Sequence, residues 1–203
     1  MSVFRFDPEE IFKDDITLDK FEAAKLQIIS AIKTFFYNWD VVSTHTLAGA
    51  AHQILHDISK TKGKRLSLKD SKMIKEDKRK EFINAVNRPQ NYFKHSDKDQ
   101  KHKLIFHHKL TPLYLFDTIR MYILLTGSQC FEMRVFLIWI QLRYPDLLNY
   151  PPAENDLRKI RADTKDPDAF TLLGLYLLEK GRRDKMEQPN LSEKPFLTSR
   201  HIS

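Results

Sequence analysis

Apolar residues in the first third of the chain recur with the spacing of an α-helix. Intervals of three, four and seven residues predict one helix from about residue 17 to 38 and a second from about 44 to 59. Thr17 and Ser43 are expected to cap these helices, because a side-chain hydroxyl can accept a hydrogen bond from the backbone N–H groups of the first turn. The pattern therefore predicts two amphipathic helices joined by a short connection.

A charged third helix and a long polar segment follow. The helix is expected to begin near residue 70 and to end by residue 88, because Pro89 disfavours helical geometry in the residue before it. Residues 88–112 are polar and contain four histidines, so we interpret them as one long loop. Long ordered loops in compact domains are often functional. This segment is therefore the first candidate for a functional site.

Two later segments, 113–126 and 131–144, are apolar almost all round, which predicts helices that are buried on most sides. A short helix is expected at about 154–162. A last helix is expected to start at Asp166-Pro167 and to reach Lys180-Gly181, with proline in its first turn and glycine marking its end. Every predicted element of the chain is a helix.

These elements predict an all-α fold: an up-and-down bundle of the first, second, fourth and fifth helices, with the charged third helix packed at its side. The chain divides into a lead-in at 1–16, a helical bundle domain at 17–148, a C-terminal helical extension at 149–181 and a mobile tail at 182–203. The last helix carries more apolar surface than one narrow stripe can hide. It is expected to cover the bundle or a second subunit, so a homodimer is anticipated.

Composition excludes several classes of protein. Hydrophobic residues make up 41% of the 203 residues and charged residues 30%, which is typical of a soluble globular chain. Only 5 residues are glycine, and no glycine-rich phosphate-binding motif is present. The longest strictly apolar run, 135–140, is too short to cross a membrane. With the single cysteine Cys130 and no secretory signal, a cytoplasmic protein is expected, with no membrane partner.

Positive charge is concentrated in the middle of the chain. The whole chain carries +7, whereas residues 60–109 contain 16 Lys or Arg and 6 Asp or Glu, which gives +10 for this segment and −3 for the remainder. Such a segment can attract phosphates and gain affinity through the release of counterions. A solvated helix face would have the same composition, so charge alone leaves both interpretations open.

Three histidines lie along one side of the predicted second helix. His45, His52 and His56 are seven and four residues apart, which places them within about 40° of one another on a helix. His52 and His56 could both reach one divalent metal ion, with Asp97 from the long loop completing the set. We expect His52, His56 and His95 to converge on one polar pocket. The alternative is that these histidines are structural.

The long loop holds the residue types that phosphate chemistry requires. Arg88 can bind a scissile phosphate with two hydrogen bonds, and His95 can move a proton near neutral pH. Further nucleic-acid contacts are expected from Asn91, Tyr92, Lys94 and Lys98. The alternative is structural: Tyr92 and Phe93 would plug the end of the bundle, and Arg88 would pair with an acidic neighbour.

The spacing of Arg88, six residues and then His95 resembles the Arg and His signature of HEPN domains. These are small all-helical bundles whose catalytic members are metal-independent endoribonucleases that act as dimers. The resemblance implies that Arg88 stabilises the phosphate and that His95 acts as general acid or base on a ribose 2′-hydroxyl, with no cofactor. Two features depart from that signature, since Pro89 follows the arginine and a loop is predicted where the family has a helix.

Residues 18–148, with AAHQILHDI on one helix and NYFKHSDKD in the next loop, also resemble a group of uncharacterised bacterial all-helical proteins, which implies no activity. Three hypotheses follow. The first is an RNA-cleaving or RNA-binding domain of the HEPN type, with an antitoxin or other protein partner in a defence or toxin–antitoxin system. The second is a metal-binding bundle that uses a divalent metal. The third is a non-catalytic interaction module.

Overall fold

A computed structural model describes residues 15–37, 40–70, 76–94, 101, 103–144, 162–164, 166 and 168–187. These residues form helices and connections, and no strand occurs among them. The elements, in chain order, are α2 (Lys20–Phe36), α3 (Val41–Thr61), the 3₁₀ turn η2 (Leu68–Asp70), α4 (Glu76–Lys94), the 3₁₀ turn η3 (His108–Leu110), α5 (Thr111–Thr126), α6 (Phe131–Arg143) and α8 (Ala169–Glu187). The all-α prediction is confirmed for this part of the chain.

The helices α2 and α3 are each capped by an aspartate rather than by the predicted hydroxyl residue. Asp19 caps α2: its carboxylate accepts from the Glu22 N–H at 2.8 Å, and the Glu22 carboxylate accepts from the Asp19 N–H at 2.8 Å. Asp40 caps α3 by accepting from the Ser43 N–H at 2.7 Å. The predicted caps Thr17 and Ser43 are therefore wrong. A carboxylate carries negative charge to the positive end of the helix dipole, which a hydroxyl does not.

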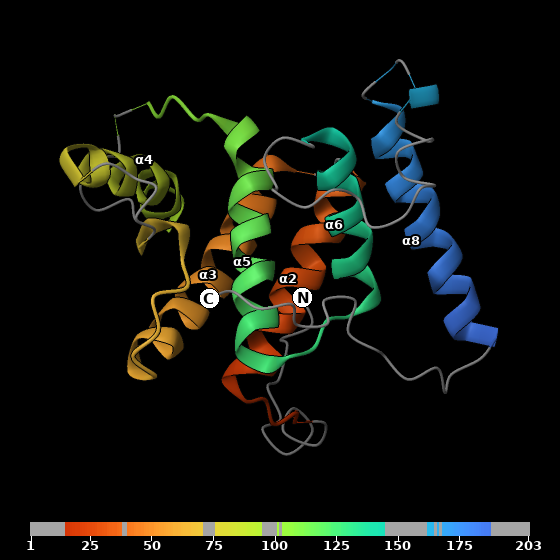
Figure 1. Cartoon of the computed structure of the whole chain (residues 1–203), viewed down its shortest axis with the longest axis horizontal. Coiled ribbons are helices and arrows are strands. Elements are labelled where there is room, and N and C mark those ends of the chain that lie inside the picture. Colours follow the sequence, from red (N-terminus) through yellow and green to blue (C-terminus); the bar gives the residue numbers. More distant parts are fainter. Residues whose placement is uncertain are drawn as a thin grey trace, which may run out of the picture.

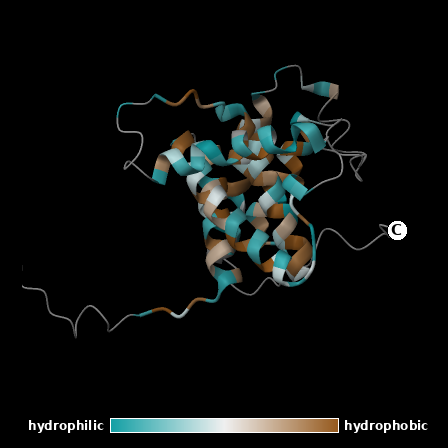
Figure 2. Cartoon of the chain, turned by 90° about the vertical axis from the view of Figure 1, so that its left-hand side faces the viewer, coloured by the Kyte–Doolittle hydropathy of each residue, from teal (hydrophilic) through white to brown (hydrophobic). Residues whose placement is uncertain are grey.

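Four helices share one core. α3 packs along α2 and α5, and α6 packs on both α2 and α5 (Figure 1). Side chains with no exposed surface fill the space between them: Ile28, Ile32, Leu55, Leu115, Ile119, Met133, Phe136 and Ile140. Hydrophobic and hydrophilic residues alternate along the helical ribbons (Figure 2). None of the described helices is long and apolar enough to cross a lipid bilayer.

α4 lies beside this core and contacts it through α3 and η2 (Figure 1). The predicted end of this helix at residue 88 is wrong, because α4 continues through Pro89 to Lys94. Pro89 and Gln90 are both buried. A Cβ on Gly49 of α3 would lie 2.9 Å from the Gln90 side chain, so the missing side chain makes room for α4. Packing of this kind can offset the roughly 3 kcal/mol that an internal proline costs.

The predicted long loop 88–112 is thus only partly irregular. Residues 88–94 are helical, 103–107 have no regular structure, η3 follows, and α5 already begins at Thr111. Pro112 lies in the first turn of α5, where its missing N–H costs nothing. The loop prediction was therefore wrong at both ends of the segment.

α8 covers one side of the bundle, where it packs on α6 and α2. Gly174 and Gly181 face the bundle, and a Cβ on either would lie 2.2 Å from a phenyl ring: Phe36 of α2 at Gly174 and Phe131 of α6 at Gly181. The prediction that the helix ends at Gly181 is wrong, because α8 continues to Glu187. Residues 182–187 of the predicted tail are therefore helical. The rest of that tail, and nearly all of the short helix predicted at 154–162, lie outside the described residues.

Candidate functional site

The outer side of α4 carries the polar residues that were assigned to a loop. Arg88, Asn91 and Lys94 are exposed and follow one another at intervals of three, so they lie along one side of the last turns of the helix. The inner side of the same turns is buried through Pro89 and Gln90. The predicted nucleic-acid contacts Asn91 and Lys94 therefore lie together with the predicted phosphate ligand Arg88. The other members of this group, His95, Asp97 and Lys98, lie outside the described residues.

The aromatic pair of α4 serves packing. Phe93 meets the ring of Phe106 edge-on at 5.2 Å between centroids and the ring of His45 at 6.1 Å. Tyr92 is half-buried and lies 6.1 Å from Phe93, again edge-on. Phe93 thus plugs the space between α4 and α3, as the structural alternative predicted. Tyr92, which was predicted to contact a base, keeps only part of its surface accessible.

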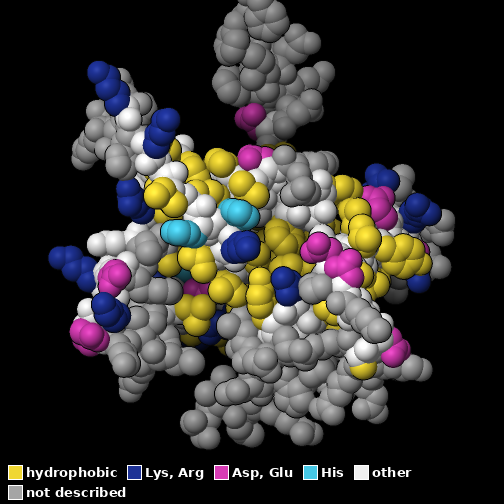
Figure 3. Space-filling view, turned by 90° about the horizontal axis from the view of Figure 1, so that it is seen from above, with side chains coloured by type: hydrophobic (Ala, Val, Ile, Leu, Met, Phe, Trp, Pro, Cys, Tyr) yellow, Lys and Arg dark blue, Asp and Glu magenta, His cyan; other side chains and the backbone are white. Residues whose placement is uncertain are grey.

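The segment before α5 extends the exposed surface beyond α4 and adds both polar and apolar side chains to it. Exposure alternates along it: Lys103, Ile105 and His107 are exposed, whereas Leu104 and Phe106 are half-buried. The contact between Phe93 and Phe106 holds this segment against the end of α4. Figure 3 views the molecule from this side and shows histidine side chains next to Lys or Arg side chains among hydrophobic ones.

A buried polar network lies between α3, α5 and η2, centred on Asp117 of α5. Only 2% of Asp117 is exposed. One carboxylate oxygen, Oδ2, accepts from the Leu68 N–H at 2.9 Å, the Ser67 hydroxyl at 3.2 Å and His52 Nε2 at 3.1 Å. The other, Oδ1, accepts from the Arg120 guanidinium at 2.8 Å. Burial raises the pKa of this carboxyl, but the hydrogen bonds and positive charge around it outweigh that effect, so the net pKa is lowered.

The two histidines predicted to share a metal ion are each bonded to a different carboxylate. His52 Nε2 lies 3.1 Å from Asp117 Oδ2, and His56 Nε2 lies 3.2 Å from Asp70 Oδ2. Burial lowers the pKa of His52, although the hydrogen bond to Asp117 acts in the opposite direction. Among the described residues no three His, Cys, Asp or Glu side chains are placed to hold a metal ion. The third predicted ligand, Asp97, lies outside them.

Ser67, His52 and Asp117 contain the residue types of a nucleophilic triad in an arrangement that cannot act as one. A triad requires the aspartate on one ring nitrogen and the serine on the other. Here the Ser67 hydroxyl and the Asp117 carboxylate both face Nε2, each at 3.1 Å, and Ser67 also donates directly to Asp117. The ring is fully buried. The network therefore holds η2 against the bundle.

Lys69 continues the network from η2 to α4. Its Nζ donates to Asn87 Oδ1 at 2.6 Å and lies 5.2 Å from the centre of the Tyr114 ring. Burial lowers the pKa of Lys69 to about 8, although nearby carboxylates act in the opposite direction. The Arg79 guanidinium of α4 also donates to the Lys69 carbonyl at 2.7 Å. α4 is thus tied to the bundle on its inner side, which fixes the direction of its exposed side.

His45 occupies an aromatic environment near the start of α3. Its ring lies 5.1 Å from Phe106 and 5.3 Å from Tyr114, and Nδ1 is 3.2 Å from the Thr111 hydroxyl. Burial lowers the pKa of His45 to about 4, with a smaller contribution from the charge of Lys69. The histidine stripe read from the sequence is therefore real, but two of its three members lie inside the fold. His45 and His52 are both buried.

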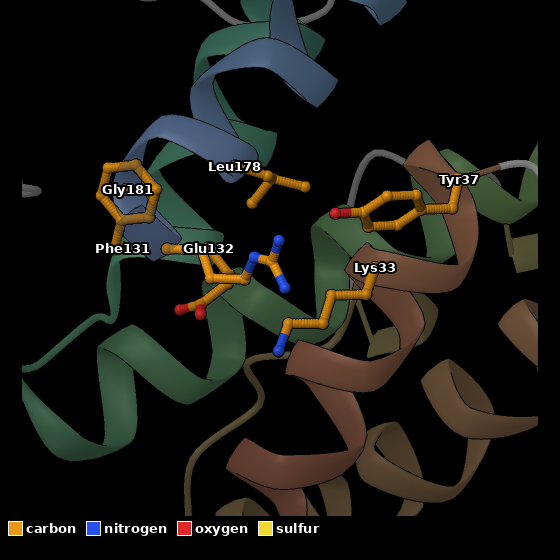
Figure 4. A pocket seen from close by; sticks show the side chains of 7 residues that line it. Lys33, Tyr37, Phe131, Glu132, Leu178 and Gly181 are labelled. Atoms are coloured by element: carbon orange, nitrogen blue, oxygen red, sulfur yellow. The ribbon is translucent and has the colours of Figure 1, made fainter. Parts of the chain in front are cut away.

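A separate cavity of about 260 Å³ lies where α8 crosses α2 and α6. Its walls combine two cations, a carboxylate, a phenol and apolar groups: Lys33, Tyr37, Phe131, Glu132, Leu178, Gly181 and Arg182. Figure 4 shows the Tyr37 hydroxyl directed toward the space below Leu178, with the Phe131 ring beside Gly181. None of these residues was predicted to form a site. In Figure 1, α8 lies on the side of the bundle opposite α4.

Sequence reasoning missed the members of the buried network other than His52 and His56. One signal was present: Asp117 is the only charged residue before Arg120 in the apolar run that begins at Leu113. A lone carboxylate in a buried helix needs compensating donors nearby. Ser67 and Lys69 carry no comparable signal, because hydroxyl and ammonium side chains are ordinary in a polar connection.

Comparison with known proteins finds no match for this chain among family models, curated proteins or solved structures.

Proposed function

We propose that this chain is an RNA-binding helical domain of the HEPN type that cleaves RNA with Arg88 and His95, acting in the cytoplasm as a homodimer. The observation that carries the proposal is the exposed row of Arg88, Asn91 and Lys94 on a helix whose other side is fastened to the bundle. Cleavage is the further step, and it depends on His95.

The α4 surface suits a phosphate backbone for two reasons. The fastening of its inner side through Asn87 and Gln90 orders the helix before RNA arrives, so binding requires little additional ordering. The surrounding segment, residues 60–109, carries +10, and its lysines and arginines can release counterions from RNA. A guanidinium such as that of Arg88 can hold one phosphate through two hydrogen bonds.

The proposed cleavage follows general acid–base chemistry without a metal. His95 takes the proton of the ribose 2′-hydroxyl, and the resulting oxygen attacks the adjacent phosphorus. The bond from phosphorus to the 5′-oxygen breaks, and that oxygen receives the proton that His95 took up, which restores the neutral ring. The products are a 2′,3′-cyclic phosphate on one fragment and a 5′-hydroxyl on the other. Arg88 stabilises the negative charge that develops on the phosphate oxygens.

Binding is tested by fluorescence anisotropy with a labelled single-stranded RNA at several salt concentrations. Arg88→Ala and Lys94→Ala are each expected to weaken binding and to lower the slope of log K against log salt by about one, which corresponds to one lost phosphate contact. Lys20→Ala, at an exposed lysine of α2, is the matched control and should leave both quantities unchanged. Equal losses in all three variants would show that the α4 surface has no special role.

Cleavage is tested on total RNA in the presence of EDTA, with the products identified by mass spectrometry. The wild-type protein should produce cyclic phosphate ends, and His95→Ala and Arg88→Ala should abolish them. Equal activity of wild type and His95→Ala removes the catalytic assignment. Salt-sensitive binding without cleavage by any of the proteins would identify the chain as the non-catalytic interaction module.

A further inference from the structure

The outward side of α8 exposes large apolar side chains. Leu172 is 69% exposed and Tyr176 is 62% exposed, and the two lie one turn apart. Phe170, Gly174 and Leu178 on the opposite side of the helix are buried against the bundle. At the right-hand edge of Figure 3, on the side that α8 occupies in Figure 1, hydrophobic side chains reach the surface between charged ones. α8 therefore carries an apolar stripe that the other described helices do not cover.

The charges along α8 are opposite at its two ends. Asp166 and Asp168 are exposed at the N-terminal end. Lys180, Arg182 and Arg183 are exposed near the C-terminal end, where the neighbouring Asp184 leaves the group net positive. Arg182 also pairs with Glu179 of its own helix at 3.1 Å. A helix with one acidic end, one basic end and an apolar centre is complementary to a second copy of itself in the antiparallel orientation.

We infer that α8 is a self-association surface that pairs antiparallel with α8 of a second copy of this chain. A two-fold axis midway between residues 175 and 176 places Asp168 of one copy opposite Arg183 of the other. The same axis brings the two Tyr176 side chains together at the centre. A parallel arrangement would instead set acidic ends and basic ends side by side and would align the two helix dipoles unfavourably.

The size of this surface sets the strength of the contact. A helix of 19 residues is about 28 Å long. Contact along one such helix lies at the small end of specific interfaces, so dissociation in the micromolar range or weaker is expected. α4 lies on the far side of the bundle from α8 (Figure 1). The paired form would leave α4 of both copies open, and the inference stands whether or not α4 binds RNA.

The test is sedimentation analysis of the full chain from about 1 to about 200 µM. The wild-type protein is expected to pass from monomer to dimer within this range, and Leu172→Glu and Tyr176→Glu should each remain monomeric. Leu124→Glu is the matched control, because Leu124 is an apolar residue of α5 with 44% exposure, and its dimerisation should equal that of wild type. Circular dichroism verifies that each variant is folded.

Charge reversal tests the antiparallel orientation. Asp168→Arg and Arg183→Asp should each weaken the homodimer, because each places two like-charged pairs across the axis. An equimolar mixture of the two variants should recover association, because the heterodimer keeps one native pair and gains one reversed pair. A monomeric wild-type protein, or dimers that persist in every α8 variant, would overturn the inference. A mixture that associates no better than its components would overturn the antiparallel arrangement.

Discussion

Replacement of Asp117 by asparagine probes the buried network with almost no change in shape. The carboxylate receives donors on both oxygens: Leu68 N–H, the Ser67 hydroxyl and His52 on one, and Arg120 on the other. An asparagine has one acceptor oxygen and one NH₂ group. Whichever way the amide turns, its NH₂ group faces a donor, so at least one hydrogen bond is lost.

The magnitude follows from the less costly orientation. With the amide oxygen toward Leu68 and His52, the bond to Arg120 is lost, and a bond to a charged group contributes about 1.5–3 kcal/mol. The remaining bonds to residue 117 lose the negative charge that strengthens them. Arg120 keeps its bond to the Leu66 carbonyl and is partly exposed, which limits the loss. We expect Asp117→Asn to lower the free energy of unfolding by about 3 kcal/mol, within the range for broken buried charge pairs.

Urea denaturation followed by circular dichroism at neutral pH measures this loss. Asp57→Asn is the matched control, because Asp57 is an exposed aspartate of α3 that accepts a hydrogen bond from Gln53 at 2.9 Å, and its effect should stay below about 0.5 kcal/mol. The lowered pKa of Asp117 adds a second readout. Stability from the ionised carboxylate is complete above its unfolded pKa and is lost as pH falls through the folded value. A loss under about 1 kcal/mol in Asp117→Asn would refute this account of the network.

Two further predictions concern His45 and α8. Because the folded pKa of His45 is about 4 and the unfolded value is 6.5, the unfolded chain binds the proton first as pH falls. His45→Phe should therefore remove up to about 3 kcal/mol of the stability loss between pH 6.5 and 4, and an unchanged pH profile of urea unfolding would contradict the assignment. Gly174→Ala should destabilise the protein by about 1–2 kcal/mol, because the clash of the new methyl group with Phe36 outweighs the gain in helix propensity. Thermal unfolding measures this loss of stability. A melting temperature above that of the wild-type protein would contradict the prediction.

The helices could be predicted from the sequence because their apolar spacing reports burial directly. The ends of the helices were harder to predict, because several nearby residues can act as a cap and only one of them reaches the N–H groups of the first turn. Asp19 prevails over Thr17 because Glu22 returns a second bond. α4 continues through Pro89 because Gln90 packs against Gly49 of α3. The sequence around Pro89 does not reveal this contact, because Gly49 lies far away in the chain. At Pro89, tertiary packing therefore determined the extent of the helix, and local propensity alone predicted it incorrectly.

The candidate site was predicted in part. Arg88, Asn91 and Lys94 share an exposed surface, although on a helix rather than a loop. The histidine stripe was correctly placed on α3, but its partners come from distant segments: Asp117 is 65 residues from His52 and Ser67 is 15. Helical periodicity places residues on one face of one helix and says nothing about the neighbour that covers that face. For this reason the hydrogen-bond partners of His52 and His56 were not predicted, while His95, the third residue of the expected pocket, lies outside the described residues.

The two glycine contacts of α8 restrict how this helix can slide along the bundle. Phe36 and Phe131 come from different helices and enter α8 at points seven residues apart, or about two turns. A displacement of α8 by one residue would place a side chain against each of the two rings. Registers shifted by one residue are therefore excluded sterically. The two glycine contacts together fix the register of α8 along the bundle. Insertion or deletion of one residue between positions 174 and 181 should consequently be tolerated far less well than the same change in the connection before α8.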